Sequence, residues 1–145
     1  MRKKILIVED NSEMLELQRL ALKEAGYIPI TASNGVEALK KARTAAPDLV
    51  LLDLVLPELD GFAVCESLRR DSATAKLPII VLTGLSSEFT KLAGMEAGAN
   101  EYVTKPASPS ELLSKIAYWL EQPPEVVARA ASMRAVAARP AGRAD

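Results

Sequence analysis

The sequence of 145 residues contains no histidine and a single cysteine, Cys65. Without histidine the chain cannot form a Ser-His-Asp or Cys-His nucleophile, a histidine-ligated zinc site or a phosphohistidine. One cysteine allows neither an internal disulfide nor a metal site made of cysteines alone. We therefore interpret Cys65 as a small apolar core residue and expect any chemistry to use other side chains.

Long apolar segments are missing as well. Aliphatic runs such as Ile5–Val8 are far shorter than the roughly 20 residues that cross a membrane as a helix. The basic first residues are followed by Glu9 and Asp10, which interrupt the apolar stretch that a signal peptide needs. We therefore expect a soluble protein of the cytoplasm.

The sequence also lacks an excess of charge of one sign. Its 18 lysines and arginines nearly balance its 19 acidic residues, which gives a net charge of −1. This balance argues against nucleic-acid binding as the main function. Hydrophobic residues make up 49% and charged residues 26%, which is typical of a globular chain of one domain, or of one domain with a tail.

Short aliphatic runs alternate with stretches of helical periodicity along the first 122 residues. The runs are Ile5–Val8, Ile28–Ile30, Leu49–Leu52, Ile79–Leu82 and Tyr102–Val103. Continuously apolar, β-branched runs are typical of parallel strands that helices cover on both faces. The alternation predicts a doubly wound α/β domain with a five-stranded parallel sheet of order 2-1-3-4-5, a flavodoxin-like arrangement with helices on both faces.

Pro123 and Pro124 end the last helical stretch and divide the chain into a domain, residues 1–122, and a tail, residues 123–145. The tail is rich in alanine and carries four arginines against two acidic residues. We expect this basic tail to be partly helical or disordered, and to be dispensable for folding.

Polar residues stand where the apolar runs end. Glu9 and Asp10 follow the first run, Asp53 follows the third, Thr83 follows the fourth and Lys105 comes shortly after the fifth. The carboxyl ends of parallel strands share one edge of the sheet, and ligands bind at the point where the strand order reverses. That point lies between the first and third strands, so we expect these five residues to lie together.

Such a cluster suits phosphoryl chemistry. Three neighbouring carboxylates repel one another unless a cation joins them, and Mg²⁺ prefers oxygen ligands. Asp53 can act as a nucleophile that carries a phosphoryl group, while Lys105 and Thr83 can bond the phosphoryl oxygens. Taken singly, Asp10 reads as a helix cap, Thr83 as a strand-end hydroxyl and Lys105 as a surface charge, so the prediction depends on their shared edge.

Longer segments carry a resemblance to a known family. They are Ile5–Asn11, Ala32–Leu39, Pro47–Gly61, Pro78–Gly84 and Gly98–Pro106. In their order and spacing, residues 1–122 resemble the receiver domain of bacterial two-component response regulators, and in particular single-domain chemotaxis-type receivers. The resemblance implies that Asp53 is the phosphoacceptor, that Lys105 bonds the phosphoryl group, and that Glu9, Asp10, Asp53 and the carbonyl of Val55 hold Mg²⁺.

The resemblance also implies a switch and partners. Thr83 would move toward the phosphoryl group, and Tyr102 would report this movement on the face of the fourth helix, fifth strand and fifth helix. The Lys105–Pro106 bond would be cis. A sensor histidine kinase or a phosphotransfer protein would donate the phosphoryl group, an unknown downstream protein would read the switched face, and a phosphatase would be a further partner. The chain would be a phosphoacceptor that assists its own reactions, not an enzyme.

Some positions depart from the family pattern. Asn100 and Glu101 stand where two aspartates are common, which weakens the case for a charged dimer face, and Ala107 replaces a common phenylalanine. The side chains two residues after the phosphoacceptor and two after the threonine flank the approach of hydrolytic water in this family. Here they are the apolar Val55 and Leu85, so we expect a long-lived phosphorylated state.

Other functions remain as alternatives. A haloacid-dehalogenase-type phosphatase needs a second acid two residues after its aspartate, where this chain has Val55. In a flavodoxin-like redox module, the flavin phosphate would meet the repelling charges of Glu9 and Asp10. A receiver-like module that binds partners without phosphate is a third alternative. No DNA-binding domain is visible after residue 122, so we expect a stand-alone receiver or a piece of a longer regulator.

Overall fold

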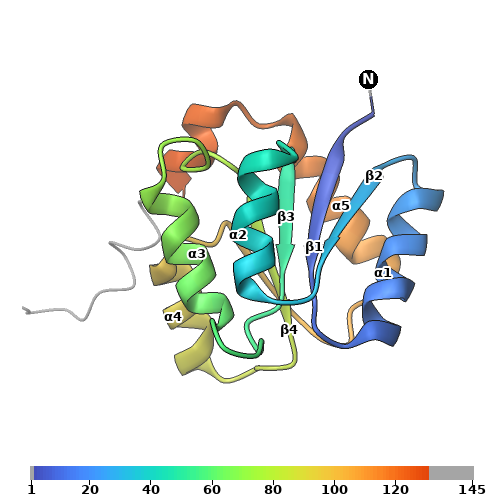
Figure 1. The fold of residues 1–145 in the computed structure, drawn as a ribbon, viewed down its shortest axis with the longest axis horizontal. Coiled ribbons are helices and arrows are strands. Elements are labelled where there is room, and N and C mark those ends of the chain that lie inside the picture. Colours follow the sequence, from blue (N-terminus) through green and yellow to red (C-terminus); the bar gives the residue numbers. More distant parts are fainter. Residues whose placement is uncertain (1, 131–145) are drawn as a thin grey trace, which may run out of the picture.

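A computed structural model describes residues 2–130 of the chain. Its five strands form one parallel sheet in the order β2-β1-β3-β4-β5, which confirms the predicted fold (Figure 1). The strands are β1 (Lys4–Val8), β2 (Ile28–Ala32), β3 (Leu49–Leu52), β4 (Ile79–Thr83) and β5 (Glu101–Thr104). Each predicted aliphatic run falls inside one of them.

A helix follows every strand. The helices are α1 (Ser12–Glu24), α2 (Gly35–Thr44), α3 (Gly61–Arg70), α4 (Glu88–Ala97) and α5 (Pro109–Glu121). Each begins with a side-chain cap that accepts a backbone N–H of the first turn, which satisfies one of the donors that a helix start leaves free. The capping residues are Asn11, Asn34, Asp60, Ser87 and Ser108.

The sheet separates two apolar cores. Alternate strand residues, such as Val50 and Leu52, pack with α2, α3 and α4 on one face. Their neighbours, such as Leu49 and Leu51, pack with α1 and α5 on the other, and Figure 1 shows the two helical layers. Both faces are therefore buried, which explains why the strands have continuously apolar sequences. Among residues 2–130, no helix combines the length and the apolarity that a membrane crossing requires.

The first residues of the predicted tail lie against the domain. Residues 124–130 are helical, Val127 is buried in the core beside Trp119, and its carbonyl accepts a hydrogen bond from Asn100 Nδ2 at 3.0 Å. Val127 and Ala130 thus join the start of the tail to the core, and the dispensability of the tail for folding stays a prediction. The boundary after Gln122 stays a prediction, and residues 131–145 lie outside the described part.

Candidate functional site

Backbone hydrogen bonds fix the residues that follow the strands. The amide of Glu9 donates to Ala32 O at 3.1 Å, and the amide of Asp53 donates to Val8 O at 3.0 Å. The amide of Lys105 donates to Thr83 O at 2.8 Å. The parallel ladder thus continues past the ends of the strands, so the backbones of Glu9, Asp53 and Lys105 are set by the sheet and not by a loose loop.

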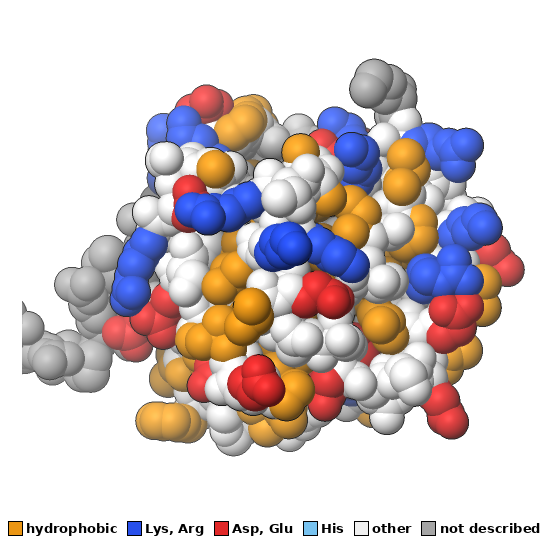
Figure 2. All heavy atoms as spheres, in the orientation of Figure 1, with side chains coloured by type: hydrophobic (Ala, Val, Ile, Leu, Met, Phe, Trp, Pro, Cys, Tyr) orange, Lys and Arg blue, Asp and Glu red, His pale blue; other side chains and the backbone are white. Residues whose placement is uncertain are grey.

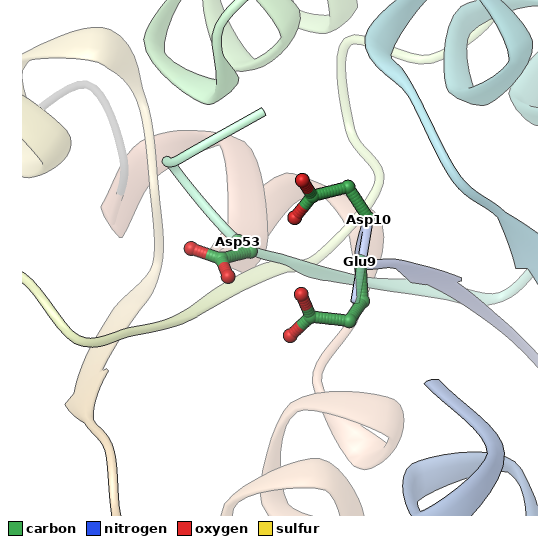
Figure 3. A group of neighbouring side chains, drawn as sticks. All are labelled: Glu9, Asp10 and Asp53. Atoms are coloured by element: carbon green, nitrogen blue, oxygen red, sulfur yellow. The ribbon is translucent and has the colours of Figure 1, made fainter. Parts of the chain in front are cut away.

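Three carboxylates meet at this edge. One oxygen from each of Glu9, Asp10 and Asp53 lies within 4.8 Å of the others, and Figure 3 shows the side chains coming from the ends of β1 and β3 with their carboxylates turned toward one region. Glu9 is 2% exposed and Asp53 is 7% exposed, whereas Asp10 is open to solvent. The site is therefore anchored in the protein and accessible from one side.

Lys105 pairs with two of the three acids. Its Nζ donates to Asp53 Oδ2 at 2.8 Å and also to Glu9 Oε1. Burial alone would lower the pKa of Lys105, but the hydrogen bonds and charges of Asp53 and Glu9 outweigh it and raise that pKa above its ordinary value. Lys105 is the one cation among the described residues that forms ion pairs with these acids, so the cluster keeps a negative charge that suits a divalent cation.

Thr83 and Tyr102 are linked through the segment after β4. Thr83 is fully buried, and its hydroxyl accepts from the amide of Leu85 at 3.4 Å. The Tyr102 hydroxyl donates to the carbonyl of the same Leu85 at 2.6 Å. The ring of Tyr102 lies over Gly94 of α4, where an added Cβ would meet two ring carbons at 3.0 Å. One residue, Leu85, therefore contacts both Thr83 and Tyr102.

The loop after β3 is held close to Asp53. The amide of Val55 donates to Asp53 Oδ1 at 3.1 Å, and Val55 itself is 55% exposed. At the other end of the loop, the amide of Gly61 donates to Leu54 O at 3.0 Å. The loop therefore returns to its own beginning at the point where α3 starts.

An apolar groove opens beside the site. It has a volume of about 400 Å³ and is lined by residues of α1 and α5, among them Met14, Leu17 and Leu112, together with Lys105 and Pro106. Leu17 is 63% exposed on the rim of this groove. The groove therefore offers an apolar contact surface next to the lysine of the acidic cluster.

A larger cleft, of about 650 Å³, lies between α2 and α3 and is remote from the acids. Lys40, Arg43 and Arg70 line it, and Figure 2 shows Lys and Arg side chains gathered over this side of the molecule. Arg43 and Arg70 lie in the last turns of α2 and α3, where cations complement the helix dipole, and Arg43 pairs with Asp71 at 2.6 Å. We interpret this cleft as a structural feature.

The structure brings the side chains of Glu9, Asp10, Asp53 and Lys105 together, and the carbonyl of Thr83 accepts from the amide of Lys105 beside them. The Lys105–Pro106 peptide is cis, as the resemblance implied. Sequence reasoning missed the Leu85 carbonyl that accepts the Tyr102 hydroxyl, because a backbone acceptor leaves no mark in the sequence. It also missed the close approach at Gly94, for which a glycine inside a helix was the available signal.

Comparison with known proteins gives a consistent picture. Residues 5–117 match the family described as response regulator receiver domain. The alkaline phosphatase synthesis transcriptional regulatory protein PhoP of Bacillus subtilis is 47% identical over 116 residues, which are 80% of this chain and 48% of that protein. The chain thus spans about half the length of the curated relatives that it matches.

Two solved structures extend the comparison. A CheY-like response regulator receiver domain protein from Methanospirillum hungatei has a TM-score of 0.78 and 30% identity, covering 83% of this chain and 95% of its own. The receiver domain of a sensor histidine kinase from Pseudomonas aeruginosa has a TM-score of 0.79 and 29% identity, covering 84% of this chain and 100% of its own. That structure is described with a magnesium ion coordinated in its active site cleft.

Proposed function

This chain belongs to the response regulator receiver domain family, and we propose that it accepts a phosphoryl group on Asp53 in a reaction that needs Mg²⁺. The observation that carries the proposal is the cluster of Glu9, Asp10 and Asp53, in which one cation, Lys105, pairs with Glu9 and Asp53. Acids gathered with so little compensating charge are costly for the fold, which is typical of a site that receives a cation.

The donor set fits magnesium. Mg²⁺ is bound by one or two carboxylates together with waters and phosphate oxygens, and the open side at Asp10 leaves room for such partners. Glu9, Asp10, Asp53 and the carbonyl of Val55 would hold the ion. When bound, it would draw charge from the phosphoryl oxygens and orient them toward Asp53.

The chain's own residues would perform the transfer as follows. A carboxylate oxygen of Asp53 attacks the phosphorus of the donor, a new O–P bond forms, and the P–N bond to the donor histidine breaks, with the electron pair leaving on the nitrogen. Lys105, already bonded to Asp53, stays protonated and neutralises charge on the phosphoryl oxygens. Its fixed position means that little reorganisation is needed at the moment of reaction.

Thr83 and Tyr102 would carry the signal away from the site. The new dianionic group attracts the Thr83 hydroxyl, and the shared contacts at Leu85 link that movement to Tyr102. Phosphorylation would then shift the population between two arrangements of the α4-β5-α5 face. NMR with and without beryllofluoride tests this, because shifts confined to the acidic pocket would contradict the switch.

The groove between α1 and α5 supports a helical donor protein. Its apolar lining opens beside Lys105, so an apolar helix seated there would hold a phosphohistidine near Asp53. We therefore propose a sensor histidine kinase or phosphotransfer protein as donor, an unknown downstream protein as reader and a phosphatase as a further partner. These roles make the chain a phosphoacceptor of the cytoplasm and not a turnover enzyme.

A mass measurement tests the proposal. The protein is incubated with acetyl phosphate and Mg²⁺, and the intact mass is compared with that of Asp53→Ala treated in the same way. We expect a phosphoryl adduct on the parent only, lost when Mg²⁺ is chelated and strongly reduced in Asp10→Ala. An adduct that persists in Asp53→Ala would contradict the assignment. A parent that takes no phosphoryl group from acetyl phosphate would favour the phosphate-independent interaction module.

A further inference from the structure

The loop between Asp53 and α3 runs between the first turns of two helices. Figure 1 shows the start of α2 beside the segment that leads from β3 into α3. Within this loop, Glu58 has a φ of 65°, a left-handed conformation that is unfavourable for a non-glycine residue. A residue keeps such a conformation only where the surrounding contacts determine it, so the contacts on both sides of the loop matter.

On the side that faces α3, the loop packs against Gly61. A Cβ at this position would lie 2.4 Å from Asp53 O and 2.5 Å from Leu54 Cα. The backbone of α3 therefore rests directly on the backbone of the proposed phosphoacceptor, and a side chain at Gly61 would have no space.

On the side that faces α2, the loop packs against Gly35. A Cβ there would lie 2.6 Å from Leu59 O and 2.8 Å from Val64 Cγ2. The helix α2 cannot easily retreat, because Ala38 and Ala42 are buried in the core against the sheet and Lys41 Nζ donates to Thr31 O of β2 at 2.5 Å. An added methyl group at Gly35 would therefore displace the loop rather than the helix.

We infer that Gly35 is a positioning residue for the magnesium and phosphoryl site, acting through Leu59 on the loop that carries Val55. The inference rests on the proposed function. It assigns to the segment Ala32–Leu39 a role that no side-chain chemistry suggests. Because Gly35 has no Cβ, α2 can pack directly against the loop, and this contact holds the Val55 carbonyl in place beside Asp53.

The test is the Mg²⁺ affinity of Gly35→Ala, measured by NMR titration of the Asp53 and Val55 amides in otherwise folded protein. We expect the affinity to fall by roughly tenfold, the lower end of the losses seen when groups that support metal ligands are changed. Val36→Ala, at an exposed position in the same helical turn, should bind Mg²⁺ like the parent.

A second control separates positioning from simple loss of stability. Val127→Ala removes a buried side chain from the other core, so it should lower the melting temperature without changing the Mg²⁺ affinity. If Gly35→Ala is too unstable to study, Val64→Ala added to it removes one obstructing atom and leaves the Leu59 carbonyl. The double variant should then bind Mg²⁺ weakly, while Val64→Ala alone binds it normally.

The outcomes are distinct. Weak binding in Gly35→Ala, with parent-like binding in Val127→Ala, supports the inference. Equal affinity in Gly35→Ala and the parent would overturn it and leave the proposed function intact. A parent that binds neither Mg²⁺ nor beryllofluoride would overturn both the inference and the proposed function.

Discussion

The carboxyl ends and the amino ends of the parallel strands form two opposite edges of the sheet, here called the carboxyl edge and the amino edge. Both bury charged side chains, but these side chains are compensated in different ways. At the carboxyl edge, three acids lie together and two of them, Glu9 and Asp53, pair with Lys105. At the amino edge, the guanidinium of Arg69 donates to the carbonyls of Gly98, Ala75 and Leu77 and to Asn100 Oδ1, at distances between 2.6 and 3.0 Å. All four acceptors are neutral, and together they satisfy the cation.

This difference in how the buried charges are compensated distinguishes a network that stabilises the fold from a site that binds a ligand. Burial lowers the pKa of Arg69, yet a guanidinium keeps its charge in proteins, so its hydrogen bonds are needed for stability. Polar groups whose hydrogen bonds are all satisfied inside the fold have no free donor or acceptor for a ligand. The acids of the other edge keep unbalanced charge, so their best partner comes from solution. Changes at the amino edge should therefore affect folding, and changes at the carboxyl edge should affect binding.

The largest effect is expected for Arg69→Leu. The change would leave the carbonyls of Gly98, Ala75 and Leu77 without their Arg69 donor inside the protein, and each buried group left unsatisfied costs about 1–3 kcal/mol. Asn100 Oδ1 would keep the amide of Ile79 as a donor. We expect the free energy of unfolding, measured with urea, to fall by about 3 kcal/mol or more, while the folded protein keeps its Mg²⁺ affinity. Arg70→Leu is the matched control, because Arg70 is 79% exposed; similar losses in both variants would contradict the comparison.

Asp10→Asn should show the opposite behaviour. Removing one of three clustered negative charges relieves repulsion, so we expect the metal-free protein to be as stable as the parent or more stable. The parent should gain about 2.7 kcal/mol when Mg²⁺ is at 100 times its Kd, and Asp10→Asn should gain little at the same concentration. Thermal unfolding with and without Mg²⁺ measures both. A variant that gains as much as the parent would remove Asp10 from the metal site.

Val127→Ala tests whether the residues that follow α5 contribute to the stability of the amino edge. Val127 is 1% exposed and its carbonyl is bonded to Asn100, so we expect a loss of about 2 kcal/mol in unfolding free energy. Val126→Ala, next to it and 39% exposed, should lose much less. If both variants match the parent, residues 123–130 add nothing to the fold and the tail is dispensable, as the sequence suggested.

The sequence predicted one edge better than the other for a physical reason. At the carboxyl edge, Glu9, Asp53 and Thr83 directly follow apolar runs, so they stand out in the sequence, and the strand order places these strand ends at one edge. At the amino edge, three of the four acceptors of Arg69 are backbone carbonyls, which every residue possesses. The burial of Val127 was hidden for a similar reason, because an alanine-rich segment gives no sign of which face it packs.

The close approach at Gly35 was likewise not predictable from the sequence. A glycine gives no sign in the sequence of which backbone it approaches. Only the packed structure shows Leu59 O at the place where a side chain would begin. Helices, strands and polar strand ends follow local patterns, whereas backbone contacts between distant segments depend on the assembled fold.

The smallest expected effect concerns water at the carboxyl edge. An aspartyl-phosphate is lost when water attacks opposite the Asp53 oxygen, and a group near that line can orient the water. Val55 is half-exposed and Leu85 is partly buried, and their apolar side chains offer water neither a donor nor an acceptor. The carboxyl edge would thus bind a cation and a phosphoryl group yet hold hydrolytic water poorly, which gives the phosphorylated state a long life.

The double variant with Val55→Asn and Leu85→Glu tests whether these two apolar side chains slow the hydrolysis. Both changes leave the backbone groups that bond Asp53 and Tyr102 in place, so loading should stay similar. A positioned polar group typically speeds proton transfer by 10² or more, and we expect decay to accelerate by about tenfold, because a surface side chain is less well fixed than a catalytic one. The protein is loaded, the donor is removed, and the phosphoryl adduct is followed by mass at neutral pH. If the double variant decays no faster than the parent, the apolar side chains do not set the lifetime, and the fixed groups of the edge, Lys105 and Thr83, become the ones to change next.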